Sequence, residues 1–278
     1  MSANTPILVT GATGKVGRQV VSRLTRAGTS VRALARNPTG FEKDVEPAVG
    51  DLTDVDSVRA ALDGVESVFL VWPFFGADAV EAFLDAAGKH VRRIVFLSAF
   101  AHDPVAGPAT FHGDVERLIE KSGLDWTFLR AGGFASNTLM WADQIRGGVV
   151  RWPYGNAARS LIHEADIAEV GVLALTRDGH IGAKYNLTGP DTMTQIEQVA
   201  AIGNAVGREV RWEELARTEA RAQLAEAWGE SSFVDGALDH WASLEREPEE
   251  VTRTVQAVTG TPARTFRQWA ADHADEFR

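Results

Sequence analysis

The residues with the clearest chemical meaning are three glycines spaced three positions apart near the start of the chain. Gly11, Gly14 and Gly17 lie between the apolar run 7–9, typical of a buried parallel strand, and a helical pattern over 14–27. In such a unit the first glycine permits a tight turn, the second lets a phosphate approach the backbone, and the third lets helix and strand pack closely. The N–H groups at the start of the helix would then bind a pyrophosphate. We therefore predict dinucleotide binding by Gly11, Thr13, Gly14, Lys15, Val16 and Gly17.

The end of the next expected strand, residues 30–34, indicates which dinucleotide binds. Sites for NAD usually have an acidic residue there, which binds the ribose 2′-hydroxyl. This chain has Arg36 and Asn37 instead. The Arg36 guanidinium can pair with a 2′-phosphate and stack on adenine. The plain alternative is an exposed arginine without a role. The pattern therefore favours NADP(H) as the cofactor.

Further cofactor contacts are expected where other strands of the same sheet end. Asp51 and Leu52 follow the expected strand 45–49 and are placed to line the adenine, although an aspartate there can also cap a helix. The remaining expected contacts follow the strands 68–71 and 126–130. They are Trp72, Pro73, Gly132, Gly133 and Phe134.

Strand and helix patterns alternate over the first half of the chain. Strands are expected at 7–9, 30–34, 45–49, 68–71, 93–97 and 126–130, and helices at 14–27, 77–87 and 109–121. This alternation with short turns predicts an α/β fold with a doubly wound parallel Rossmann sheet. We expect residues 1–150 to form an NADP-binding domain. Residues 151–278 would form a smaller, mostly helical substrate-binding part, from which a strand near 184–189 returns to the sheet.

Composition and charge exclude several classes of protein. The 278 residues include no cysteine, which excludes disulfides and thiolate catalysis, and the seven histidines are too scattered to suggest a metal site. The net charge of −10 argues against nucleic-acid binding. The longest uncharged apolar run, 67–77, is too short to span a membrane, and no apolar leader follows the N-terminus. We expect a cytoplasmic protein.

Several segments resemble the NmrA-like group of atypical short-chain dehydrogenases/reductases. They are residues 7–17, 33–38, 50–53, 122–130, 134–137 and 166–170. The match covers most of residues 5–190 and fades afterwards. The resemblance implies a Rossmann fold that binds NADP(H). It leaves the activity open, because the family includes NADPH-dependent reductases and non-catalytic redox-sensing regulators.

The catalytic residues implied by this resemblance differ from the usual ones. The common Tyr-x-x-x-Lys pair is missing, because neither Tyr154 nor Tyr185 begins such a motif. The corresponding helix has His112 and Glu116, which resembles the quinone-reductase branch of the group. A histidine can donate a proton to a developing oxyanion, and Glu116, one turn later on the same face, could orient the imidazole. The plain alternative is a surface pair.

A serine and several aromatic residues complete the candidate site. Ser98, at the end of the strand 93–97, could hydrogen-bond the nicotinamide or the substrate, or it could be a buried serine bonded to the backbone. Flat ligands bind well between aromatic rings, although half or more of these rings are expected to be core. The expected substrate contacts are Phe75, Phe100, Asn137, Trp141, Trp152 and Tyr154.

Two functions follow from these observations. The favoured one is NADPH-dependent reduction of a quinone or a related flat aromatic carbonyl compound, such as an aromatic polyketide intermediate that is oxygenated later. Quinones accept hydride readily, so that positioning the nicotinamide can replace a strong acid. The alternative is a regulator that senses NADP(H) and binds a partner protein. A homodimer is compatible with both, and neither requires nucleic acid or a membrane.

Overall fold

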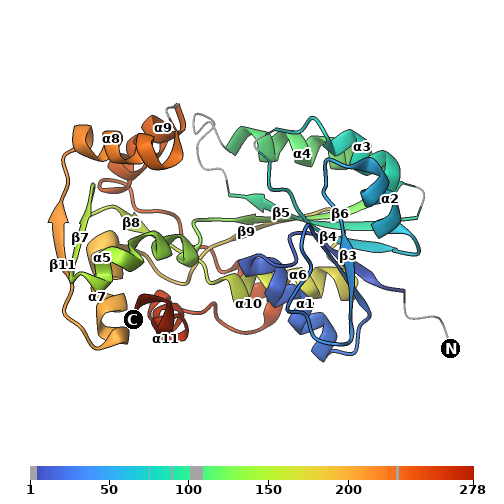
Figure 1. Cartoon of the computed structure of the whole chain (residues 1–278), viewed down its shortest axis with the longest axis horizontal. Coiled ribbons are helices and arrows are strands. Elements are labelled where there is room, and N and C mark those ends of the chain that lie inside the picture. The colour runs from blue at the N-terminus through green and yellow to red at the C-terminus, as the bar shows by residue number, and fades with distance from the viewer. Residues whose placement is uncertain (1–4, 75, 89, 101–108, 230–231) are drawn as a thin grey trace. The chain divides into compact units, whose positions relative to one another are not determined.

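The computed structural model describes residues 5–74, 76–88, 90–100, 109–229 and 232–278 (Figure 1). Within them the chain forms two compact units. The first unit contains the residues up to Phe100, Ala109–Ala131 and Glu164–Asn186. The second unit contains Gly132–His163 and Leu187–Arg278.

A seven-stranded sheet forms the centre of the first unit. The order of its strands is β3-β2-β1-β4-β5-β6-β9, and all pairs among β1 to β6 are parallel. The bounds are β1 Ile7–Val9, β2 Val31–Ala35, β3 Val45–Val49, β4 Ser67–Val71, β5 Arg93–Ala99, β6 Asp125–Ala131 and β9 Ala183–Leu187. Strand order reverses beside β1, as in doubly wound sheets. The Rossmann-type α/β fold expected from the alternating pattern is therefore confirmed, and the strand expected near 184–189 is present as β9.

Helices cover both faces of this sheet, which explains why the central strands are almost continuously apolar. Figure 1 shows α2, α3 and α4 on one face and α1 and α6 on the other. The bounds are α1 Lys15–Arg26, α2 Val55–Leu62, α3 Val80–Ala87, α4 Ala109–Lys121 and α6 Glu164–Thr176. Helix α2 was expected only as the alternative in which an aspartate at this place caps a helix. It begins at Val55 after Asp54, whose side chain accepts the N–H of Asp56.

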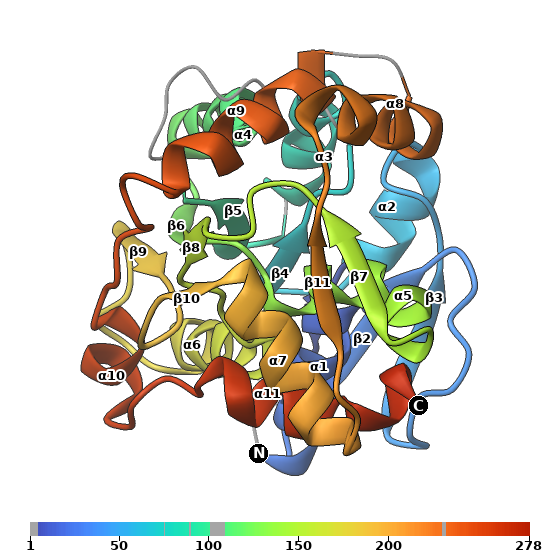
Figure 2. The ribbon, with the colours of Figure 1, turned by 90° about the vertical axis from the view of Figure 1, so that its left-hand side faces the viewer.

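The second unit is mostly helical and has two small sheets. Strand β8 pairs antiparallel with β10, and β7 pairs parallel with β11, side by side in Figure 2. The strands are β7 Val149–Trp152, β8 Ala158–Arg159, β10 Met193–Thr194 and β11 Arg211–Glu214. The α-helices are α5 Ala142–Arg146, α7 Gln195–Val206, α8 Arg217–Trp228, α9 Ser232–Leu244, α10 Thr254–Thr259 and α11 Phe266–Asp272. The 3-10 helices are η1 Ala135–Trp141 and η2 Ala274–Phe277.

The border between the units does not fall at residue 150. The chain leaves the first unit after Ala131, at the end of β6, and returns to it for Glu164–Asn186. The returning segment contains α6, which packs against α1 on one face of the sheet, and β9, which pairs beside β6. The sheet needs this segment to cover its apolar face, and a single cut in the sequence therefore cannot separate the units.

In the described part of the chain, no helix combines the length and the apolar character that crossing a membrane requires.

Candidate functional site

The glycine loop has the geometry of a tight strand-to-helix turn. Gly11 adopts a left-handed conformation with φ of +58°, which costs little only for glycine. The N–H of Gly14 donates to the carbonyl of Gly11 at 2.9 Å, which closes the turn. A Cβ added to Gly17 would lie 2.2 Å from that same carbonyl oxygen. The third glycine thus allows helix α1 to start directly against the turn, as the sequence predicted.

The start of helix α1 fits a bound pyrophosphate. Gly14 is the N-cap and has no side chain with which to cap the helix, and the first turn contains no acidic residue. Gly11, Thr13, Gly14 and Lys15 are all exposed. Exposed amides at the positive end of a twelve-residue helix form a binding site for an anion. The residues present therefore fit the phosphates of a dinucleotide.

A threonine that the sequence analysis missed fixes this turn to the neighbouring strand. The hydroxyl of Thr10 donates to the carbonyl of Val71 at 3.0 Å and accepts the N–H of Val71 at 2.7 Å. A Cβ on Gly11 would lie 3.0 Å from the side chain of Val71. The ends of β1 and β4 are thereby held together at the base of the loop. The signal was present, because threonine is the residue between the apolar run and Gly11.

The expected adenosine contacts lie at the ends of β2 and β3. Arg36 and Asn37 are exposed and directly follow β2. Asp51 accepts hydrogen bonds from the backbone and the hydroxyl of Thr53, and these bonds, together with the nearby charge of Arg36, hold the pKa of Asp51 below its usual value. Leu52 is buried in the core between the sheet and α2–α4.

The other expected cofactor contacts have varied surroundings. The indole N–H of Trp72 donates to the carbonyl of Gly76 at 2.8 Å, and the ring is buried in the core, whereas Pro73 is exposed. Gly132 donates its N–H to the carbonyl of Leu187 at 2.8 Å, so that the chain stays extended beyond β6. Gly133 accepts the N–H of Ile162, and the half-buried Phe134 forms a bridge with the same residue.

Ser98, Glu116 and Arg130 form a closely bonded group at the ends of β5 and β6. The Ser98 hydroxyl donates to Oε1 of Glu116 at 2.6 Å. Arg130 donates Nε–H to Oε1 at 2.9 Å and Nη2–H to Oε2 at 2.5 Å. Ser98 and Glu116 are buried, and the hydrogen bond to Glu116 raises the pKa of Arg130. Ser98 and Glu116 were expected in the site from the sequence, whereas Arg130, which also bonds Glu116, was not.

His112 is half-buried near the start of α4 and lies among aromatic rings. Its ring centroid is 3.9 Å from that of Phe111 and 6.2 Å from that of Phe96. The carboxylate of Glu116 accepts hydrogen bonds from Ser98 and Arg130. The helical spacing had suggested a pair between Glu116 and His112 instead. The role of His112 as a proton donor stays a prediction.

The expected substrate contacts are not equally accessible. Phe75 lies outside the described residues; Phe100 is half-buried and Asn137 is exposed. Trp141 and Trp152 are buried in the core of the second unit, with ring centroids 6.2 Å apart. Their indole N–H groups are fully buried and have no acceptor within the described part of the chain, and a substrate contact for them stays a prediction. Among the described residues no group of side chains could hold a metal ion.

Tyr154 stands in an unusual backbone conformation. Its φ of 60° is the one positive value among the non-glycine residues that the structure describes. Its N–H donates to Glu214, its carbonyl accepts from Gln195, and its hydroxyl accepts from Arg217 at 3.1 Å. The hydroxyl of Tyr154 is therefore already bonded to the protein, and a substrate contact through it stays a prediction.

Comparison with known proteins identifies the family. A family described as NAD(P)H-binding matches residues 11–178, which is more than half of the chain. The chain belongs to this family. The match confirms the expected cofactor class and agrees with the resemblance to NmrA-like dehydrogenases/reductases.

Several similar proteins are reductases. The chain is 42% identical to a (4-alkanoyl-5-oxo-2,5-dihydrofuran-3-yl)methyl phosphate reductase of Streptomyces griseus, over 98% of this chain and 99% of that protein. It is 34% identical to an NAD(P)H azoreductase of Xenophilus azovorans, over 98% and 99%. The crystal structure of an NADPH-dependent quinone oxidoreductase from Escherichia coli, with NADPH bound, covers 96% of this chain and 99% of its own, at 24% identity and a TM-score of 0.81. The protein is an NAD(P)H-dependent oxidoreductase.

Proposed function

We propose that this protein reduces a flat, conjugated carbonyl compound with NADPH, and that the acceptor is a quinone or an unsaturated lactone. When bound, NADPH supplies a hydride, which adds to an electron-poor carbon of the acceptor. A proton completes the reduction on oxygen or on the adjacent carbon, and NADP⁺ is released. The substrate thus gains two electrons and two hydrogens, and no other reactant is needed.

The observation that carries this proposal is the group formed by Ser98, Glu116 and Arg130. Helix α4 has no tyrosine to act as an acid, and the one proton of the Ser98 hydroxyl is donated to Glu116 at 2.6 Å. Such a site supports acceptors that take hydride without strong acid assistance. Conjugated quinones and lactones stabilise the added charge over several atoms, whereas a simple ketone does not. His112 is the residue that we assign to proton donation.

The relatives support the same class of acceptor. The S. griseus relative is named for a substrate with an unsaturated lactone ring, and the X. azovorans relative for an azo compound. These acceptors share an electron-poor double bond in a flat conjugated system. The choice of NADPH over NADH rests on Arg36, exposed at the end of β2, where NAD-specific sites usually have an acid.

The test is oxidation of NADPH by the purified protein with a panel of acceptors. The panel contains a naphthoquinone, a 4-alkanoyl furanone, an azo dye and, as the control, a saturated cyclic ketone. We expect turnover with at least one conjugated acceptor and none with the saturated ketone. Tight binding of NADPH without turnover of any acceptor would contradict the proposal and favour the regulatory alternative.

A further inference from the structure

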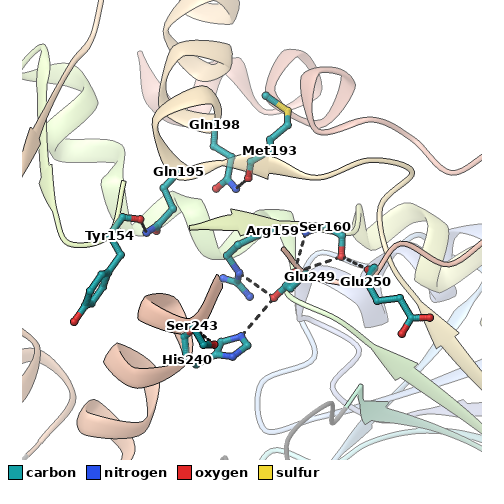
Figure 3. Close-up of polar contacts among 10 residues, drawn as sticks. All are labelled: Tyr154, Arg159, Ser160, Met193, Gln195, Gln198, His240, Ser243, Glu249 and Glu250. Atoms are coloured by element: carbon teal, nitrogen blue, oxygen red, sulfur yellow. Dashed lines mark hydrogen bonds and ion pairs between the residues drawn. The ribbon is translucent and has the colours of Figure 1, made fainter. Parts of the chain in front are cut away.

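A buried carboxylate joins three segments of the second unit (Figure 3). Oε1 of Glu249 accepts from Nε of Arg159 at 3.2 Å and lies 3.5 Å from Nε2 of His240. Oε2 accepts the backbone N–H of Ser160 at 2.8 Å. Arg159 belongs to β8, His240 belongs to α9, and Glu249 lies in the segment between α9 and α10. None of these residues was singled out by the sequence analysis.

The backbone around Glu249 is also bound to this region, so that the position of its carboxylate is fixed. The N–H of Glu249 donates to the carbonyl of Ala158 at 3.0 Å, and the hydroxyl of Ser160 donates to the carbonyl of Glu250 at 2.8 Å. Two residues later, the N–H of Thr252 donates to the hydroxyl of Thr188 at 2.9 Å. Glu249 is therefore a rigid support for the guanidinium that it binds.

The two terminal nitrogens of Arg159 have no hydrogen-bond partner among the residues that the structure describes, since Arg159 binds Glu249 through Nε. The side chain of Arg159 is 15% exposed, and neither terminal nitrogen is fully buried. An arginine held through Nε presents its terminal N–H groups as a planar fork, which matches two oxygens of a phosphate or carboxylate. The guanidinium is thus supported on one side and open on the other.

The Nη2 atom of Arg159 packs against Gly133. A Cβ added to Gly133 would be 2.2 Å from Nη2 of Arg159. Gly133 follows β6, and ligands of open α/β sheets bind beyond the carboxyl ends of the strands. His240, whose side chain is 37% exposed, adds a second group that can be cationic beside the same carboxylate. Arg159 therefore lies beside a residue that follows β6 by two positions.

We propose that Arg159 binds a phosphate monoester of the substrate, with its terminal nitrogens as donors and Glu249 as the support of the guanidinium. The proposal rests on the reductase function proposed above and adds that the substrate is an anion. A phosphate fits better than a carboxylate, because it carries more charge and offers a third oxygen toward His240. Arg159 is a binding residue here and takes no part in hydride or proton transfer.

The test is calorimetric binding to the protein saturated with NADP⁺, which does not depend on turnover. The probes are a (4-alkanoyl-5-oxo-2,5-dihydrofuran-3-yl)methyl phosphate, the alcohol without its phosphate, and the matching carboxymethyl compound. We expect the phosphate to bind at least about tenfold tighter than the alcohol, as charge-assisted hydrogen bonds imply. In Arg159→Gln this preference should disappear. Equal affinity of phosphate and alcohol for the wild type, or no binding of the phosphate, would overturn the proposal, and a preference for the carboxylate would overturn the choice of phosphate.

Two further variants separate binding from folding. Arg159→Gln alone leaves Glu249 buried without its main cation, so the double variant Arg159→Gln/Glu249→Gln removes both charges together. Arg151→Gln is the matched control, because Arg151 is an exposed arginine of the same unit that pairs with Glu213 at 2.7 Å. The double variant should lose the preference for phosphate, and the control should keep it. A double variant that is folded and retains the preference would refute the role of Arg159.

Oxidation of NADPH by the same compounds distinguishes the two proposals. If no acceptor is reduced while the phosphate still binds through Arg159, the proposed reaction fails and the anion site stands. If the alcohol and the phosphate are reduced with the same KM by the wild type, the reaction stands and the anion site fails.

Discussion

The hydroxyl of Ser98 donates its single proton to the carboxylate of Glu116, across 2.6 Å between β5 and α4. Both oxygens of that carboxylate also accept from Arg130. A serine hydroxyl has one proton and two lone pairs. Ser98 can therefore accept a hydrogen bond from a ligand but has no second proton to donate, so the hydrogen bond expected with the nicotinamide or the substrate would have Ser98 as its acceptor.

Replacing Ser98 with alanine should therefore have a modest effect. Ser98→Ala removes one acceptor, so we expect KM for the acceptor or for NADPH to rise by roughly threefold to tenfold, with a smaller change in kcat. Steady-state kinetics with a quinone and NADPH measure both. A fall in kcat of a hundredfold or more at unchanged KM would mean that Ser98 supplies a proton in the transition state.

Arg130 should matter mainly to stability. Arg130→Met leaves the Glu116 carboxylate buried without its cation, and we expect a loss of about 3 kcal/mol in the free energy of unfolding. The double variant Arg130→Met/Glu116→Gln should lose less than the sum of the two single variants, because it removes both charges. Denaturant unfolding measures these values. Arg117→Gln is the control, since Arg117 forms an exposed pair with Asp114 on the same helix and should change stability by less than about 0.5 kcal/mol.

The sheet of the first unit could be predicted from the sequence because its strands are short apolar runs between turns. The central residues of β1, β4 and β5 are buried on both faces of the sheet. Each of these strands is therefore a continuous apolar run, which can be recognised without knowledge of the rest of the chain. Helix α2 was expected only as the alternative in which an aspartate caps a helix there, and its eight residues bury only Val58, Ala61 and Leu62. The strand near 184–189 was expected to return to the sheet and does so as β9, whereas the helix α6 that returns with it was not expected there, because a helical pattern does not record which sheet the helix covers.

The candidate site was predictable in part, for a similar reason. The glycines act through backbone geometry, and their spacing alone placed them at the turn. Arg130 and Arg159 act through partners distant in the chain, Glu116 fourteen residues and Glu249 ninety residues away. An arginine in sequence gives no sign of such a partner. Trp141 and Trp152 were named as substrate contacts from their aromatic character, but burial in the core decides their surroundings.

Arg36 should determine the choice between the two nicotinamide dinucleotides. In Arg36→Ala we expect the Kd for NADPH to rise about tenfold or more and the Kd for NADH to stay nearly unchanged, because only NADPH carries the 2′-phosphate. Fluorescence titration with both cofactors measures the change. Arg59→Ala, which removes an exposed arginine of α2 paired with Asp56, is the control and should leave both values as they are. An unchanged preference in Arg36→Ala would refute the assignment.

Gly17 should not tolerate a side chain. The Cβ of Gly17→Ala would lie 2.2 Å from the carbonyl oxygen of Gly11, a backbone atom that cannot move without opening the turn. We expect a destabilisation of roughly 2–4 kcal/mol and weaker NADPH binding. The control is Gly236→Ala in α9, where a Cβ meets no atom within 4 Å of the described structure and should be neutral or stabilising. Thermal melting with and without NADPH compares the two, and equal melting temperatures would contradict this geometry.

The ion pair between Glu249 and Arg159 should make the stability of the folded protein depend on pH, with a loss at acidic pH. Burial alone would raise the pKa of Glu249, but the charge of Arg159 and the hydrogen bonds from His240 and Ser160 outweigh it and lower the pKa from 4.5 to about 2. A carboxyl whose pKa is lowered by folding stabilises the folded state above its unfolded pKa, and this contribution is lost as the pH falls through the folded value. Its size is on the order of 3 kcal/mol.

The variant Glu249→Gln should therefore melt at a lower temperature than the wild type near neutral pH, and the gap between them should narrow as the pH falls from about 4.5 toward 2. Glu213→Gln is the matched control, because Glu213 pairs with Arg151 in a more exposed setting and should show a small gap that changes little with pH. Melting temperatures of the three proteins over this range decide the matter. A gap for Glu249→Gln that stays constant down to the lowest pH would show that the Glu249 carboxylate is not held charged by Arg159, and the support that we assign to it would be lost as well.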